Sequence, residues 1–303
     1  MSAGLAAITL ILAACNGSDS SSPEAGTPLT MADAQAISNE MQGELAGITS
    51  GASVQDFLAP PLTALPGADR AFHGPIFFNP LSNCPIPSEN PPTDTDGDGV
   101  PDNLTLSFEP PAECTFTSPR GNAVLELSGN VTISDPSAVD RGIRIEFQDF
   151  QKKTTVNETT FFLRRVDGVL QQISSATGFS ATDNTTVTWE SSQFPTAELA
   201  KAWQVDFVAD AGATFSHRFH LPSGILTVVG KTTRTHGGLI RSLSVETTDP
   251  LHFDASCAAD NRIVSGTLTI VHTGPSGTST ITIVFNGCGQ DPTVTLVTGP
   301  TAS

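Results

Sequence analysis

Apolar and polar residues alternate along much of this chain, beginning at about Leu104. In the segment 143–148, for example, Ile143, Ile145 and Phe147 are separated by charged or amide side chains. Successive side chains of a β-strand point to opposite faces, so this pattern predicts antiparallel strands with one buried and one wet face. Similar segments recur at 125–133, 187–189, 203–207, 268–270, 281–285 and 294–296. About ten to twelve strands at this spacing predict an all-β fold, arranged as a meander, a sandwich or an open barrel.

One helix is predicted before these strands, from Thr30 to about Ile48. Thr30 can cap its first turn, with Asp33 three residues further on. An apolar stripe then recurs at steps of three and four residues, at Ala34, Ile37, Met41, Leu45 and Ile48. Residues 49–100 are rich in proline and glycine, which indicates a long loop region.

Three shorter segments predict chain reversals or a helical turn. Asp167-Gly168 lies between the strand-like segments 161–166 and 169–173, and this dipeptide is typical of a β-hairpin. Gly237-Gly238 predicts the turn between 225–231 and 239–245. Residues 195–202 suggest a short helical turn.

The beginning of the chain carries a targeting pattern. An apolar run at residues 5–14 ends in Leu-Ala-Ala-Cys at Cys15, and a polar Ser-, Gly- and Pro-containing segment follows. This layout resembles the lipobox of bacterial lipoproteins, although no Lys or Arg precedes the run, which is consistent with a translation start upstream of Met1. The alternatives are an ordinary cleaved signal peptide or a short anchor, but the run has about half of the roughly 20 residues that span a bilayer.

The lipobox resemblance implies a location. Cys15 would be lipidated after removal of the preceding peptide, and the protein would be held in the cell envelope by its acyl chains. In such lipoproteins, Asp at the position after the cysteine resembles an inner-membrane retention signal. This chain has Asn16 at that position, so we expect the outer membrane if the source is Gram-negative. We therefore expect a signal peptide (1–15), a tether (16–29), a helix with a Pro/Gly-rich region (30–103) and a β-rich domain (104–303), with 30–303 forming one structural unit.

Charge limits the partners. The chain has 31 Asp and Glu against 14 Lys and Arg, a net charge of −17. Nucleic-acid phosphates and anionic lipid headgroups would be repelled by such a protein, so we expect no nucleic-acid partner and membrane contact through the N-terminal lipid alone. The sequence does not identify a ligand or protein partner.

The remaining four cysteines predict two disulfides. Cys84, Cys114, Cys257 and Cys288 form an even set, as expected in an oxidising compartment. Three connectivities exist, and we predict Cys84–Cys114 with Cys257–Cys288 because this pairing closes two local loops. The rival, a four-cysteine zinc site, would usually contain Cys-x2-Cys pairs, which the sequence lacks.

The sharpest chemical motif is the segment 94–102, Asp-Thr-Asp-Gly-Asp-Gly-Val-Pro-Asp, here named the aspartate loop. Asp94, Asp96 and Asp98 occupy relative positions 1, 3 and 5, and Gly99 stands at position 6, where a calcium loop bends sharply. The carbonyl of Val100 and the carboxylate of Asp102 complete the candidate ligands. Such hard oxygen donors suit Ca²⁺.

This segment resembles the Asp-Gly calcium loops of thrombospondin type 3 repeats. It departs from an EF-hand because Thr105 stands where a bidentate Glu would, so Glu109 or Glu113 would have to supply that ligand. The alternative is a solvated acidic turn. Because Cys84 and Cys114 bracket the loop, we expect calcium to be structural.

The sequence supports a catalytic site less well than it supports the calcium loop. His217 and His220 fall on opposite faces of a strand pattern and cannot share a metal, and His272 continues the apolar register of Leu268 and Ile270. His236-Gly237-Gly238 resembles an esterase oxyanion loop, but the chain lacks the Gly-x-Ser-x-Gly elbow of those enzymes. Glu146, Asp149 and Glu190 lie in strand-like segments and are candidates for a glycosidase carboxylate pair, but with 31 acidic residues any such pair carries little information.

We therefore expect a non-enzymatic binding or structural lipoprotein with a calcium site. The alternative is a carrier of hydrophobic ligands or lipoproteins, to which a helix followed by a long meander is similar at the level of fold alone. An esterase or glycosidase ranks last.

Overall fold

The computed structural model describes residues 28–49, 84–110, 112, 114–117, 123–137, 140–157, 160–193, 195–213, 221–258 and 262–299. Within these residues the chain forms one helix and one 13-stranded sheet. The elements are α2 (Met31–Thr49), β1 (Ile86–Pro87), β2 (Leu104–Ser107), β3 (Thr115–Thr117), β4 (Ala123–Ser134), β5 (Arg141–Val156), β6 (Thr160–Ser175), β7 (Gly178–Ser191), β8 (Ala197–Ala209), β9 (Gly224–His236), β10 (Leu239–Phe253), β11 (Ile263–Gly274), β12 (Gly277–Phe285) and β13 (Thr293–Thr298).

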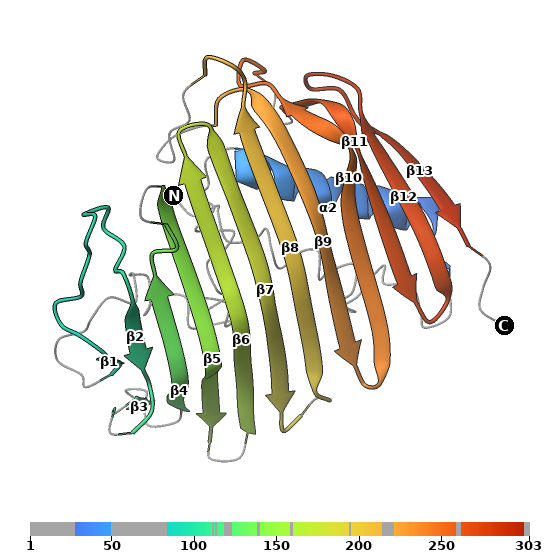
Figure 1. The fold of residues 1–303 in the computed structure, drawn as a ribbon. Helices are drawn as coiled ribbons and strands as arrows, with labels where there is room; N and C mark the ends of the chain where they lie inside the picture. Colours follow the sequence, from blue (N-terminus) through green and yellow to red (C-terminus); the bar gives the residue numbers. More distant parts are fainter. Residues whose placement is uncertain are drawn as a thin grey trace. The chain divides into compact units, whose positions relative to one another are not determined.

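The sheet is a meander. Strands that follow one another in the sequence are neighbours in the order β1-β2-β4-β5-β6-β7-β8-β9-β10-β11-β12-β13, and β3 pairs with β4 (Figure 1). Most of the pairing is antiparallel, as in β4 with β5 and in β9 through β13. The predicted all-β fold with an N-terminal helix is therefore confirmed, in its meander form.

The described chain divides into two compact units. One contains α2, the first half of β7, most of β8, and β9–β13, and the other contains β1–β5, most of β6 and the remainder of β7. Each unit has a buried face built from the alternating residues of its strands.

In the unit that contains α2, the buried face of the sheet is aliphatic and aromatic. The side chains of Leu226, Leu268, Ile270, Ile281 and Ile283 are 0% exposed, and they come from β9, β11 and β12. The ring of Phe179 stacks on Phe207 at a centroid distance of 5.8 Å. Because residues two apart share a face, the alternation in the sequence places the apolar side chains of each strand on one face of the sheet.

Helix α2 packs its apolar stripe inward and contacts β13 (Figure 1). Ala34, Ile37, Met41 and Leu45 are buried, as the spacing predicts. The expected cap is also present, since the Asp33 N–H donates to the Thr30 hydroxyl at 3.3 Å and the Thr30 N–H donates to the Asp33 carboxylate at 2.8 Å. No helix of the described residues is long and apolar enough to cross a membrane.

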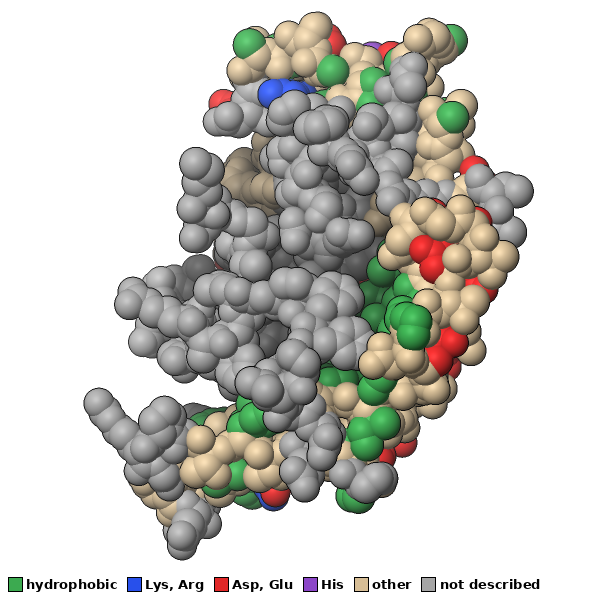
Figure 2. All heavy atoms as spheres, turned by 90° about the vertical axis from the view of Figure 1, so that its left-hand side faces the viewer, with side chains coloured by type: hydrophobic (Ala, Val, Ile, Leu, Met, Phe, Trp, Pro, Cys, Tyr) green, Lys and Arg blue, Asp and Glu red, His purple; other side chains and the backbone are tan. Residues whose placement is uncertain are grey.

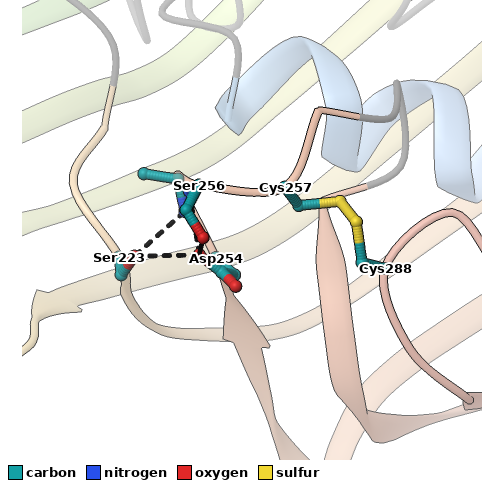
Figure 3. Close-up of a disulfide and its surroundings, with 6 residues drawn as sticks. Ser223, Asp254, Ser256, Cys257 and Cys288 are labelled. Atoms are coloured by element: carbon teal, nitrogen blue, oxygen red, sulfur yellow. Dashed lines mark hydrogen bonds between the residues drawn. A yellow bond between two sulfur atoms is a disulfide. The ribbon is translucent and has the colours of Figure 1, made fainter.

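A disulfide joins Cys257, after β10, to Cys288, after β12, with Cα atoms 5.7 Å apart (Figure 3). The turn beside it is organised by Asp254, whose carboxylate accepts hydrogen bonds from the N–H and the hydroxyl of Ser256 at 2.8 and 2.7 Å. These bonds lower the pKa of Asp254, and further hydrogen bonding by Ser223 acts in the same direction.

The other unit has its own aromatic cluster and disulfide. Phe150 lies against Phe108 and Phe147, at ring-centroid distances of 5.1 and 6.2 Å, and all three rings are buried. Cys84 and Cys114 are bonded, with Cα atoms 5.1 Å apart. Both predicted disulfide pairings are therefore confirmed.

Two local predictions were wrong. Residues 195–202 do not contain a helical turn, because β8 begins at Ala197. Asp167-Gly168 does not reverse the chain either, and β6 runs through both residues. The carboxylate of Asp167 accepts a hydrogen bond from the Asp149 N–H at 2.6 Å, and Asp149 has a φ of 50°. Asp167 therefore contacts the neighbouring strand β5 and does not form a turn. The turn predicted at Gly237-Gly238 is present between β9 and β10.

Candidate metal site in the aspartate loop

The aspartate loop lies between β1 and β2, and the Cys84–Cys114 disulfide closes the segment that contains it. It has no regular secondary structure, and most of its side chains are exposed. Its shape therefore depends on hydrogen bonds to its own carboxylates rather than on an apolar core.

Three carboxylates converge in this loop. Asp94, Asp96 and Asp98 each offer one oxygen, and these three atoms lie within 4.8 Å of one another. Calcium–oxygen distances are about 2.3–2.6 Å, so two ligands on opposite sides of the ion are separated by about 4.6–5.2 Å. Three oxygens this close together can contact one ion of this size, and an all-oxygen donor set is the chemistry that calcium prefers.

Backbone N–H groups hold the carboxylates in place. Asp94 accepts from Gly97 at 2.8 Å and from Gly99 at 3.0 Å, while Asp98 accepts from Val100 at 2.7 Å. Gly97 and Gly99 have φ angles of +75° and +92°. Only glycine adopts such angles at little cost, so the two glycines permit the tight winding that brings alternate aspartates together.

Two predicted ligands have other roles in the described loop. Asp102 is not among the converging carboxylates, and it accepts hydrogen bonds from the N–H and the hydroxyl of Thr95, at 3.0 and 2.5 Å. These bonds lower the pKa of Asp102. Glu109 is also engaged, because it accepts the Gly129 N–H at 2.7 Å. Glu113 lies outside the described residues.

Sequence reasoning missed Asp135, which follows β4. Its N–H donates to the carbonyl of Pro101 at 2.9 Å, so the end of β4 is tied to the aspartate loop. This contact follows from the pairing of β2 with β4, in which Leu104 is opposite Ile133. The Asp135-Pro136 dipeptide, 33 residues after Asp102, offers no signal of this proximity in the sequence.

The pKa of Asp96 is raised above its ordinary value. The largest single influence, a hydrogen bond from the Asp98 backbone, lowers this pKa. Desolvation, repulsion from Asp98 and Asp135, and a hydrogen bond with Asp94 together outweigh it. Negative charges thus crowd around Asp96, and a bound cation would relieve their repulsion.

Acidic side chains are also more prominent than basic ones on the visible face of the described residues. Among the described residues facing the viewer in Figure 2, red patches are more extensive than blue ones. The basic residues Lys152 and Arg164 are partly buried, and burial lowers the pKa of Arg164 to about 10. Lys153 pairs with Glu126 at 2.9 Å. Such a surface attracts cations and repels polyanions.

The other candidate catalytic residues are dispersed or engaged. His217 and His220 lie outside the described residues. His236 is exposed at the end of β9, whereas His272 is half-buried in β11. Glu146 forms an ion pair with Arg144 at 3.0 Å. No cluster of three or more potential metal-ligating side chains other than Asp94, Asp96 and Asp98 is found in the described part of the chain.

Comparisons with known proteins give no relative. No family model, curated protein or solved structure matches this chain. The chain's own residues are therefore the basis for assigning its function.

Proposed function

We propose that this protein is a lipid-anchored binding or structural lipoprotein of the bacterial envelope, and that calcium in the aspartate loop is a structural ion. The observation that carries the calcium assignment is the convergence of Asp94, Asp96 and Asp98 within 4.8 Å on a loop wound by two left-handed glycines. Side chains of these three residues would hold the ion. The Val100 carbonyl, Asp102, Asp135 or water would complete its shell.

A structural role is favoured over a catalytic one by the surroundings of the loop. The Cys84–Cys114 disulfide and the bond from the Asp135 N–H tie the loop segment to neighbouring parts of the chain, and the bonds between Thr95 and Asp102 close the loop on itself. A cation bound there would add another link to a segment that has little core of its own. Exposed oxygen ligands without a bidentate Glu suit a dissociation constant of about 10⁻⁴–10⁻³ M, as in extracellular modules.

The envelope location rests on the Leu-Ala-Ala-Cys pattern and on the disulfides. Cys15 lies outside the described residues, and the two disulfide pairs agree with an oxidising compartment. The alternative is a carrier of hydrophobic ligands, which would need an apolar cavity beside the buried face of the sheet. Replacing Cys15 by Ser should release the protein from the membrane fraction, and unchanged membrane association would refute lipidation.

The calcium assignment is tested by thermal unfolding in calcium and in a chelator. We expect millimolar calcium to raise the melting temperature by a few degrees, because an ion that binds only the folded state stabilises it by mass action. Asp96→Ala should abolish this rise, because it removes one of the three converging carboxylates.

Asp249→Ala is the matched control. Asp249 is an exposed acid in β10, far along the chain from the loop, and its loss changes the net charge equally. This variant should keep the full calcium response. If both variants respond like the native protein, or if calorimetry detects no binding at millimolar calcium, the loop is an acidic turn.

A further inference from the structure

The last strand of the sheet, β13, has an edge that no described strand covers. It pairs with β12 on one side, and the strand order ends with it. Its sequence, Thr-Val-Thr-Leu-Val-Thr, contains no charged residue and no proline. Natural edge strands are commonly protected by charges, prolines, bulges or short length, and β13 has none of the first three.

The hydrogen-bonding phase of this edge follows from one bond. The Gly299 N–H donates to the Thr278 carbonyl at 2.7 Å, in register with the β12–β13 pairing. In an antiparallel pair, bonded and non-bonded positions alternate. Thr293, Thr295 and Val297 therefore direct their backbone groups towards β12, whereas Val294, Leu296 and Thr298 direct theirs away from it.

The first strand of the sheet differs. β1 is only two residues long, Ile86–Pro87, and one of them is a proline that cannot donate a hydrogen bond. This short strand leaves little backbone for another strand to pair with. Of the two ends of the described sheet, β13 is the one that can accept a further strand.

We propose that β13 pairs antiparallel with β13 of a second copy of this chain, about a two-fold axis at Leu296. In this arrangement Leu296 faces the partner's Leu296, and Val294 faces the partner's Thr298. The Leu296 pair and the two symmetry-related pairs of Val294 with Thr298 are hydrogen-bonded pairs. Each exchanges two backbone hydrogen bonds, so the interface has six. A two-fold axis makes an antiparallel edge complementary to itself, which is why a second copy is the occupant that fits.

Side chains and charge agree with this pairing. Val297 is 67% exposed and would lie opposite the partner's Thr295, a cross-strand pair of β-branched residues. The protein carries a net charge of −17, so most of its surface repels a second copy. An uncharged edge is a place where two copies can approach with little local repulsion, and added salt should strengthen the association.

The experiment is sedimentation equilibrium of the full chain carrying Cys15→Ser, which prevents both acylation and cross-linking through this cysteine. A six-residue edge buries less area than a standard interface, so we expect a weak dimer, populated at about 100 µM and above. The mass should rise towards twice that of one chain, and the dimer fraction should increase between about 50 and about 500 mM salt.

Two variants locate the interface. Val297→Lys adds a charge to the edge and should weaken the dimer, raising its dissociation constant at least about tenfold. Val208→Lys makes the same change at a side chain that is 57% exposed on β8, and it should leave the constant unchanged. Thr298→Pro removes an outward N–H without breaking a bond to β12, and it should also weaken the dimer.

The outcomes decide the proposal separately from the calcium assignment. A monomer at all concentrations and salt levels overturns it, and so does a dimer that Val297→Lys and Val208→Lys weaken equally or that Thr298→Pro leaves intact. Asp96→Ala should leave the dimer unaffected, because the aspartate loop and β13 belong to different compact units.

Discussion

At the scale of single residues, His272 is a side chain whose protonation should affect stability. It lies on β11, in register with Leu268 and Ile270, and is half-buried. Burial lowers its pKa, and the positive charge of Arg241 lowers it further. The neutral imidazole is therefore the form that the fold accommodates.

The pKa shift predicts a pH dependence. The folded state binds a proton on His272 less readily than the unfolded state, whose pKa is about 6.5. This contribution to stability is complete above that value and is lost as the pH falls through the lower folded pKa. We expect the free energy of unfolding, measured in urea, to decline between about pH 7 and pH 5.

His272→Asn should flatten this decline, because the replacement does not titrate. His236→Asn is the matched control, since His236 is exposed at the last position of β9, and it should retain the native slope. Equal slopes for the native protein and the His272 variant would contradict the prediction.

At the scale of elements, the start of α2 depends on a reciprocal cap. The Thr30 hydroxyl accepts the Asp33 N–H, and the Asp33 carboxylate accepts both the N–H and the hydroxyl of Thr30, at 2.8 and 2.6 Å. Thr30→Ala should lower the free energy of unfolding by about 1 kcal/mol, whereas Thr30→Ser, which keeps the hydroxyl, should lose much less. If chemical denaturation finds the two variants equally unstable, the hydroxyl is not the stabilising group.

Elements with local signals were predictable. The helix follows from its cap and its stripe, and the strands follow from alternation, because both patterns act over neighbouring residues. The prediction of a hairpin at Asp167-Gly168 was wrong. The carboxylate of Asp167 instead accepts a hydrogen bond from the Asp149 N–H of the neighbouring strand. A dipeptide pattern does not contain that tertiary contact, so the same two residues fit inside a long strand.

At the scale of the whole molecule, only those residues of the candidate site that lie close together in the sequence were predictable. The spacing of Asp94, Asp96 and Asp98 places their oxygens together, as the loop shows. Asp135 was not predictable, because it reaches the loop through the register of β2 against β4. Strand register depends on the whole sheet, and it determined which distant acid lies beside Asp96.

The two disulfides permit a test of how the aspartate loop is coupled to the fold. Each closes a loop of about 30 residues, and in the chain-entropy model each contributes about 3.5 kcal/mol. Cys84–Cys114 encloses the aspartate loop, whereas Cys257–Cys288 belongs to the other compact unit. Without the first disulfide, calcium would have to order a freer segment as it binds, so part of its binding free energy would be lost.

We therefore expect Cys84→Ser with Cys114→Ser to weaken calcium binding at least about threefold in titration calorimetry, below the melting temperature of the variant. Cys257→Ser with Cys288→Ser serves as the control, since it removes a crosslink of nearly the same span, 31 residues against 30. It should lower the melting temperature similarly and leave calcium affinity unchanged. An equal loss of affinity in both variants would mean that calcium responds to overall stability, and that the disulfide around the aspartate loop does not preorganise the site.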